Sequence, residues 1–150
     1  MKNILIISFT SFVLSTFMTF DRAHSNMNPS LTVNVEGLKN SRGVVQYALY
    51  DREGSLPDQK LKKYHQIRTS SISNGKSSTT FSDLTPGTYA ISVLHDEDED
   101  GKIEMGLLLP KEGIGFSNFE TIGLSNRPNF SKASFVLAKD STIVVNMIYK

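Results

Sequence analysis

The sequence of 150 residues has no cysteine, no tryptophan and only three histidines. Without cysteine, a disulfide-stapled miniprotein and a cysteine-ligated zinc finger are both excluded. The sequence also lacks an excess of one charge, since 16 Lys and Arg stand against 15 Asp and Glu. We therefore expect neither a nucleic-acid partner bound through bulk positive charge nor a disordered polyelectrolyte. With 39% hydrophobic residues, the composition is typical of one ordinary globular domain.

The start of the chain differs in composition from the rest. Lys2 precedes an apolar run at residues 4–20, and a short polar stretch then leads to Ala23-His24-Ser25. This order is typical of a cleaved secretory signal peptide. An uncleaved membrane anchor is the alternative, but the run is shorter than the roughly 20 residues of a spanning helix. We expect residues 1–25 to be removed, and residues 26–150 to form a single secreted or periplasmic domain with no membrane span.

Short segments with alternating or β-branched residues follow, and turn signals separate them. The alternation places Leu31, Val33 and Val35 on one face of the first strand. The full set of predicted strands comprises residues 31–36, 44–50, 65–73, 76–81, 89–95, 133–138 and 141–149. Seven short strands without a long helix predict an all-β protein, an antiparallel seven-stranded β-sandwich such as the Ig-like type.

Two turns have specific signals. Asn74-Gly75 tolerates the positive φ angles of a two-residue turn, which predicts a hairpin between residues 65–73 and 76–81. Tyr89 follows a Pro-Gly turn and is placed like the tyrosine of a β-sandwich corner, whose hydroxyl bonds nearby backbone. A plain core aromatic is the alternative for Tyr89.

One connection, at residues 96–130, is unusually long, and its Gly, Pro and aromatic residues favour an ordered loop. It begins with an acidic turn, residues 96–104, in which six carboxylates stand against one lysine. The D-x-D-x-D-G spacing is typical of a calcium loop, because oxygen ligands at alternate positions converge on one hard cation. The predicted calcium ligands are Asp96, Asp98, Asp100, the backbone carbonyl of Lys102, and Glu104.

The acidic turn is not an EF-hand, because Leu107 occupies the position of the bidentate glutamate and no amphipathic helices flank the loop. A missing ligand would come from elsewhere in the long connection, for which Glu112 and Asn118 are candidates. A solvated acidic turn is the alternative. Carboxylates this crowded repel one another unless a cation is present, so the ion site is favoured.

A glycine-rich stretch, residues 113–118, lies further along the connection. Its two glycines would let the backbone approach a ligand closely, while the following side chains offer an apolar platform and hydrogen bonds. The predicted ligand-binding residues are Gly113, Gly115, Phe116, Ser117 and Asn118. Alternatively, the glycines form a bulge and Phe116 plugs the end of the sandwich.

Several motifs together resemble one bacterial family. They are the acidic turn preceded by His95, the stretch from Pro110 to Asn118, Pro128-Asn-Phe130, and the Pro86-Gly87-Thr-Tyr89 corner. Over residues 31–149 the chain resembles the bacterial secreted domain-of-unknown-function family 2141. That family typically mixes Asp and Asn in the acidic turn, whereas all three alternate positions here are Asp. The resemblance implies a sandwich similar to transthyretin-like and carboxypeptidase regulatory modules, and it implies no activity.

Three functions follow as hypotheses. The first is a non-enzymatic binding or structural module whose loop is ordered by calcium and which binds a small ligand or a protein. The second is a small extracytoplasmic hydrolase that uses the acidic turn and His95, although we expect His95 to be hydrogen-bonded to that turn rather than to act as a base. The third is a structural subunit that adds a strand to a partner, which predicts an exposed sheet edge at residues 31–36 or 141–149.

Overall fold

The structure is a computed structural model, and it describes residues 28–103, 105–106 and 110–149. The predicted signal peptide, residues 1–25, lies outside the described residues. The described elements are, in chain order, β1 (Leu31–Glu36), β2 (Val44–Tyr50), β3 (Gln66–Ser71), β4 (Ser77–Phe81), β5 (Gly87–Asp96), β6 (Ile114–Phe116), α1 (Phe130–Ala133), β7 (Phe135–Leu137) and β8 (Ser141–Asn146). Among them there is no helix of the length and apolar character needed to cross a membrane.

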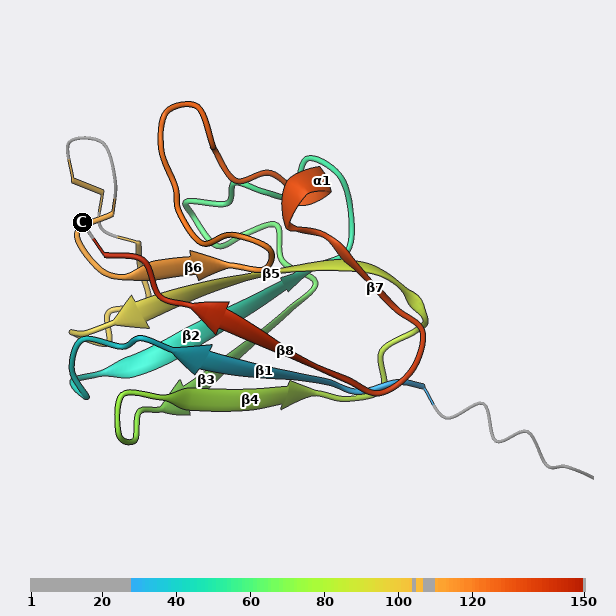
Figure 1. The fold of residues 1–150 in the computed structure, drawn as a ribbon, viewed down its shortest axis with the longest axis horizontal. Coiled ribbons are helices and arrows are strands. Elements are labelled where there is room, and N and C mark those ends of the chain that lie inside the picture. The colour runs from blue at the N-terminus through green and yellow to red at the C-terminus, as the bar shows by residue number, and fades with distance from the viewer. Residues whose placement is uncertain (1–27, 104, 107–109, 150) are drawn as a thin grey trace, which may run out of the picture.

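The strands form two sheets that pack face to face (Figure 1). The smaller sheet has the order β4-β1-β8, and the larger has the order β3-β2-β5-β6, with β7 also paired to β5. Strand pairs in the larger sheet are antiparallel. The all-β sandwich expected from the alternating pattern is therefore confirmed.

The strand count and one strand direction differ from the prediction. The described residues contain eight strands rather than seven, because residues 114–116 of the long connection form β6 beside β5. In the smaller sheet β1 is antiparallel to β4 but parallel to β8. The alternation of apolar residues reports which face of a strand is buried and carries no information on strand direction, so the parallel pair could not be foreseen.

The turn at Asn74-Gly75 is confirmed, but the extended hairpin is wrong. Both turn residues have positive φ, +50° and +70°, and Ser73 and Lys76 exchange backbone hydrogen bonds of 2.8 and 3.0 Å. Beyond this single bridge the two arms separate, since β3 pairs with β2 and β4 pairs with β1. The turn thus connects the two sheets instead of closing a ladder within one.

The main core lies between the sheets. Leu31, Val33 and Val35 are fully buried there, as their alternation predicts. The tyrosine corner is also confirmed: the Tyr89 hydroxyl donates a hydrogen bond of 2.8 Å to the carbonyl of Thr85, and its ring joins the core. The position of β1 between β4 and β8 shows that the predicted free edge at residues 31–36 is wrong, whereas β8 ends its sheet.

A second apolar cluster lies on the opposite face of the larger sheet. Its buried members come from β2, β5, α1 and the connections that follow β2 and β6, and they are Ala48, Tyr50, Leu56, Ala90, Phe119, Phe130 and Ala133. The connections that follow β2 and β6 lie together on this side, with α1 beside them (Figure 1). The predicted strand at residues 133–138 is shorter than expected because Asn129 caps α1, accepting a hydrogen bond of 2.9 Å from the Lys132 amide.

Candidate metal centre

The acidic turn begins where β5 ends, and β2 fixes its position. Val44, the first residue of β2, lies opposite Asp96, the last residue of β5. Gly43 therefore lies directly against the turn, with φ of +65°. A Cβ at this position would stand 2.0 Å from the Asp96 carbonyl oxygen and 2.8 Å from the Glu97 Cα. Only glycine allows the backbone of the preceding loop to approach the acidic turn so closely.

Backbone amides inside the turn organise its aspartates. The buried Asp96 carboxylate accepts hydrogen bonds from the amides of Asp100, at 3.2 Å, and Gly101, at 2.9 Å. The Asp98 carboxylate also accepts one from the Asp100 amide, at 3.2 Å. Gly101 has φ of +72°, which is the sharp turn that the D-x-D-x-D-G pattern predicts after its third aspartate.

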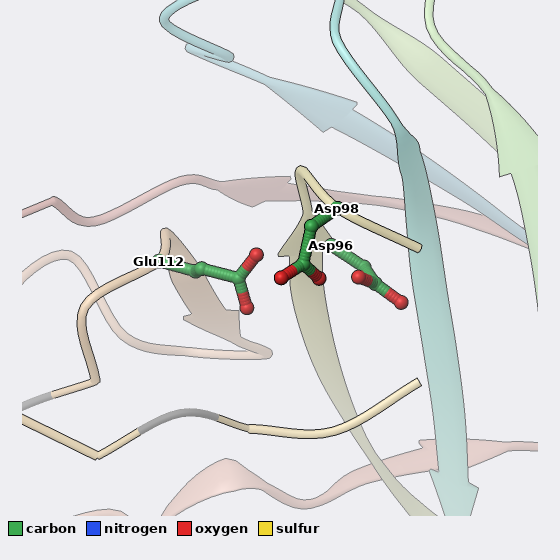
Figure 2. Close-up of side chains that lie close together, drawn as sticks. All are labelled: Asp96, Asp98 and Glu112. Carbon is green, nitrogen blue, oxygen red and sulfur yellow. The ribbon is translucent and has the colours of Figure 1, made fainter. Parts of the chain in front are cut away.

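Three carboxylates converge at this place. One oxygen each from Asp96, Asp98 and Glu112 lies within 4.8 Å of the others. Figure 2 shows the three carboxyl groups gathered between the end of β5 and the segment that leads into β6. Glu112 was only a candidate for a missing ligand, and the pairing of β6 with β5 brings it opposite the turn.

Glu112 has an unusual environment for a carboxylate. Its Oε1 accepts a hydrogen bond of 2.8 Å from the Glu97 amide, whereas its Oε2 is buried and has no hydrogen-bond partner among the described residues. Burial raises the pKa of the Glu112 carboxyl, and the negative charges of Asp96, Asp98 and Asp100 raise it further. A cation held between these groups would provide a partner for Oε2 and offset the repulsion.

Glu97 lies in the same turn but has a different role. Its carboxylate forms ion pairs with Lys39, at 2.6 Å, and with Arg42, and it accepts a hydrogen bond of 3.1 Å from Asn40. The hydrogen bond from Lys39 is the largest of the causes that lower the pKa of Glu97 to about 2, and those from Asn40 and Arg42 act in the same direction. Glu97 therefore fastens the acidic turn to the loop before β2.

The other predicted metal ligands are not among the three converging carboxylates. Asp100 does not belong to the converging group, and its carboxylate accepts hydrogen bonds from the Lys102 amide, at 2.8 Å, and ammonium, at 3.2 Å. The bond from the Lys102 amide is the main cause that lowers the pKa of Asp100. Glu104 lies outside the described residues, and ligation by the Lys102 carbonyl stays a prediction. The Asn118 amide instead donates to the carbonyls of Ala133 and Ser134, at 3.3 and 2.8 Å.

His95 is fully buried, and its described hydrogen bonds go elsewhere than to the acidic turn, contrary to expectation. Its Nε2 lies 2.9 Å from the carbonyl of Arg42, which only accepts, so Nε2 carries the proton. Its Nδ1 lies 2.8 Å from the Tyr149 hydroxyl, and that hydroxyl separately accepts a hydrogen bond of 3.2 Å from the Lys39 amide. The ring connects the end of β5 to the C-terminal segment and to the loop before β2.

The glycine-rich stretch forms β6 and the residues after it, and its groups serve internal packing. A Cβ on Gly113 would lie 2.3 Å from the Tyr149 ring, and one on Gly115 would lie 2.8 Å from the Asn146 carbonyl oxygen. The buried Ser117 hydroxyl accepts from the Ile91 amide, at 2.9 Å, and donates to the Ala133 carbonyl, at 2.6 Å. Ligand binding by this stretch stays a prediction.

Sequence reasoning missed the contribution of the loop before β2. Lys39, Asn40 and Arg42 hold Glu97, and Gly43 packs against the acidic turn. All four lie between the predicted strands at residues 31–36 and 44–50, where the sequence indicated no functional role. An antiparallel pairing of the strand at residues 44–50 with the one ending before Asp96 would have placed them side by side. The sequence shows both strands but not that they are neighbours.

The two sheets and the three converging carboxylates define an all-β sandwich protein with a candidate divalent-cation centre at the end of β5. The chain belongs to the bacterial family described as "Uncharacterized protein conserved in bacteria (DUF2141)", which matches residues 33–145. This confirms the family resemblance. No curated protein and no solved structure matches the chain.

Proposed function

We propose that this protein is a non-enzymatic binding or structural module, secreted or periplasmic, whose long connection is ordered by a calcium ion at Asp96, Asp98 and Glu112. The observation that carries the proposal is the meeting of these three carboxylates around a buried Glu112 oxygen that lacks a partner among the described residues. Like charges this close raise the free energy of the folded state, and a cation would remove that cost.

Calcium is the cation that this donor set fits best. All the side-chain donors are carboxylate oxygens, which hard cations prefer. The donors come from an irregular turn and from a second segment, a geometry that calcium tolerates and that the strict octahedron of magnesium does not. Asp100, the Lys102 carbonyl and Glu104 remain predicted additional ligands, since calcium takes about six to eight oxygens.

The predicted signal peptide at residues 1–25 supports a place outside the cytoplasm. Extracellular calcium modules bind with dissociation constants of about 10⁻⁴ to 10⁻³ M, so occupancy would follow the calcium concentration of the medium. The geometry of His95 gives no support to the hydrolase hypothesis, because the ring is fully buried and both nitrogens have partners.

Thermal unfolding with a chelator, with calcium and with magnesium tests the proposal. At ten times its dissociation constant calcium should stabilise the fold by about 1.4 kcal/mol, which raises Tm by roughly 3 to 6 °C. Asp98→Asn should abolish the rise. Glu99→Gln is the matched control, because it removes the same charge from the same turn without touching the converging group. A Tm that responds equally in both variants contradicts the proposal.

A further inference from the structure

A mostly apolar cavity of about 440 Å³ lies on the outer face of the larger sheet. Its walls come from β5, from β6 and from the connections that follow β2, β5 and β6. The connections after β2 and β6 lie on the same side of that sheet (Figure 1). Its apolar lining includes Leu56, Ile103, Met105, Ile114, Phe116 and Ile122. Small-molecule sites typically have volumes of about 300 to 1,000 Å³ and predominantly apolar walls, so both the size and the lining suit a small ligand.

The rim of this cavity exposes large apolar side chains to solvent. Met105 is 43% exposed and Leu124 is 75% exposed, and both line the cavity. Of the five exposed large hydrophobic residues among the described positions, two therefore lie at this one place. Exposed apolar groups that gather around a concave site are typical of ligand-binding surfaces.

The charged groups at the cavity favour an anionic ligand. Within the described part of the chain, the exposed Arg127 guanidinium has no hydrogen-bond or ion-pair partner, and it lines the cavity. The other charged lining residue, Asp58, is buried, and its carboxylate already accepts from the amides of Lys62, at 2.8 Å, and Lys63, at 2.7 Å. An unpaired guanidinium beside apolar walls suits a carboxylate carried on an apolar body.

We infer that the cavity binds a small amphipathic carboxylate, with its aliphatic chain against Ile114 and Phe116 and its head group at Arg127. The inference rests on the binding role proposed above and names its ligand, but it does not rest on the cation. The cavity and the carboxylates that converge at the acidic turn share no residue. The two sites can therefore be tested separately on the same protein.

Calorimetric titration with decanoate, and with decanol as the uncharged control, tests this inference. Decanoate should bind and decanol should bind more weakly. Arg127→Gln should weaken decanoate binding about three- to five-fold and leave decanol unchanged. Arg52→Gln should change neither, because Arg52 does not line the cavity. Leu124→Ser should weaken both ligands about five-fold. Its matched control is Val136→Ser, because Val136 is equally exposed, at 75%, but does not line the cavity.

Three results would overturn the inference: no decanoate binding at millimolar concentration, equal binding of decanol, or equal losses in Leu124→Ser and Val136→Ser. A separate calcium titration of the same protein, without decanoate, distinguishes failure of the cavity ligand from failure of the cation centre. Calcium binding without decanoate binding leaves the cation centre intact and overturns the cavity ligand. Decanoate binding in chelator without any calcium response supports the cavity ligand and overturns the cation centre.

Discussion

The acidic turn and the glycine-rich stretch belong to the same long connection, yet they satisfy their polar groups differently. After β6, the buried Ser117 hydroxyl and the Asn118 amide both find backbone partners. At the acidic turn, three carboxylates converge and the buried Glu112 Oε2 has no described partner. Buried polar groups are normally paired, so the unpartnered oxygen of Glu112 distinguishes the acidic turn from the glycine-rich stretch, and it is the basis of the proposed cation centre.

We expect the largest loss of stability from a substitution at Gly43, whose backbone packs against the acidic turn. Gly43→Ala would place a Cβ 2.0 Å from the Asp96 carbonyl oxygen, in backbone that has few ways to move. We expect the free energy of unfolding to fall by at least about 3 kcal/mol. Gly54→Ala is the control, because Gly54 also has positive φ, +73°, but nothing within 4 Å, and it should cost about 1 kcal/mol. Denaturant unfolding measures the loss in the free energy of unfolding for both variants. Equal losses would contradict the close packing of Gly43 against the acidic turn.

The second effect tests whether the glycine-rich stretch is structural. Ser117→Ala would leave the buried Ile91 amide without its side-chain acceptor and should destabilise the fold by about 1 to 3 kcal/mol. Ser125→Ala, at an exposed position, should change stability by less than about 0.5 kcal/mol. Denaturant midpoints compare the two variants. A Ser117→Ala protein as stable as the wild type would mean that this hydroxyl is free for another role.

The sequence predicts the core faces well and the neighbours of each strand poorly. Leu31, Val33, Val35 and Tyr89 lie where alternation and the Pro-Gly turn place them, since these signals are local. The arms of the turn at Asn74-Gly75 separate into two sheets because pairing partners are chosen over long range.

At the candidate site, too, the sequence predicts local features and misses those that depend on strand pairing. The spacing of Asp96 and Asp98 predicts that they share one side of the turn, whereas the contribution of Glu112 depends on the pairing of β6 with β5. The role of Gly43 depends on the pairing of β2 with β5. Motif spacing thus identifies the candidate ligands that one segment supplies, and tertiary pairing decides which other residues could join them.

A smaller effect is expected in the pH dependence of stability, to which Glu97 and Glu112 should contribute in opposite directions. Its pKa of about 2 lies below the ordinary 4.5, so its stabilising contribution is present above pH 4.5 and is lost as pH falls toward 2. Glu97→Gln should therefore cost about 1 kcal/mol at neutral pH and nothing at the acid end of that window. This pH dependence is checked by measuring the free energy of unfolding of the wild type and of Glu97→Gln across pH 2 to 6. A difference independent of pH would contradict the assignment.

The contribution of Glu112 to stability should change with pH in the direction opposite to that of Glu97. Because burial and its acidic neighbours raise its pKa, the folded state binds the proton more tightly than the unfolded state does. In chelator, the contribution of Glu112 to stability should fall as pH rises above 4.5, and Glu112→Gln should remove that slope. Calcium should flatten the wild-type profile as well, since the cation favours the ionised carboxylate. An unchanged slope in Glu112→Gln would show that another group causes it.

A calorimetric titration of calcium into the chelator-treated protein measures cation binding at the acidic turn itself. We predict one saturable site with a dissociation constant of about 10⁻⁴ to 10⁻³ M. The site should be lost in the Asp98→Asn, Glu112→Gln double variant and kept in the Glu99→Gln, Glu120→Gln double variant, which removes the same charge. Calcium binding that is absent in the wild type, or equal in both double variants, would contradict the claim that these carboxylates form a cation centre.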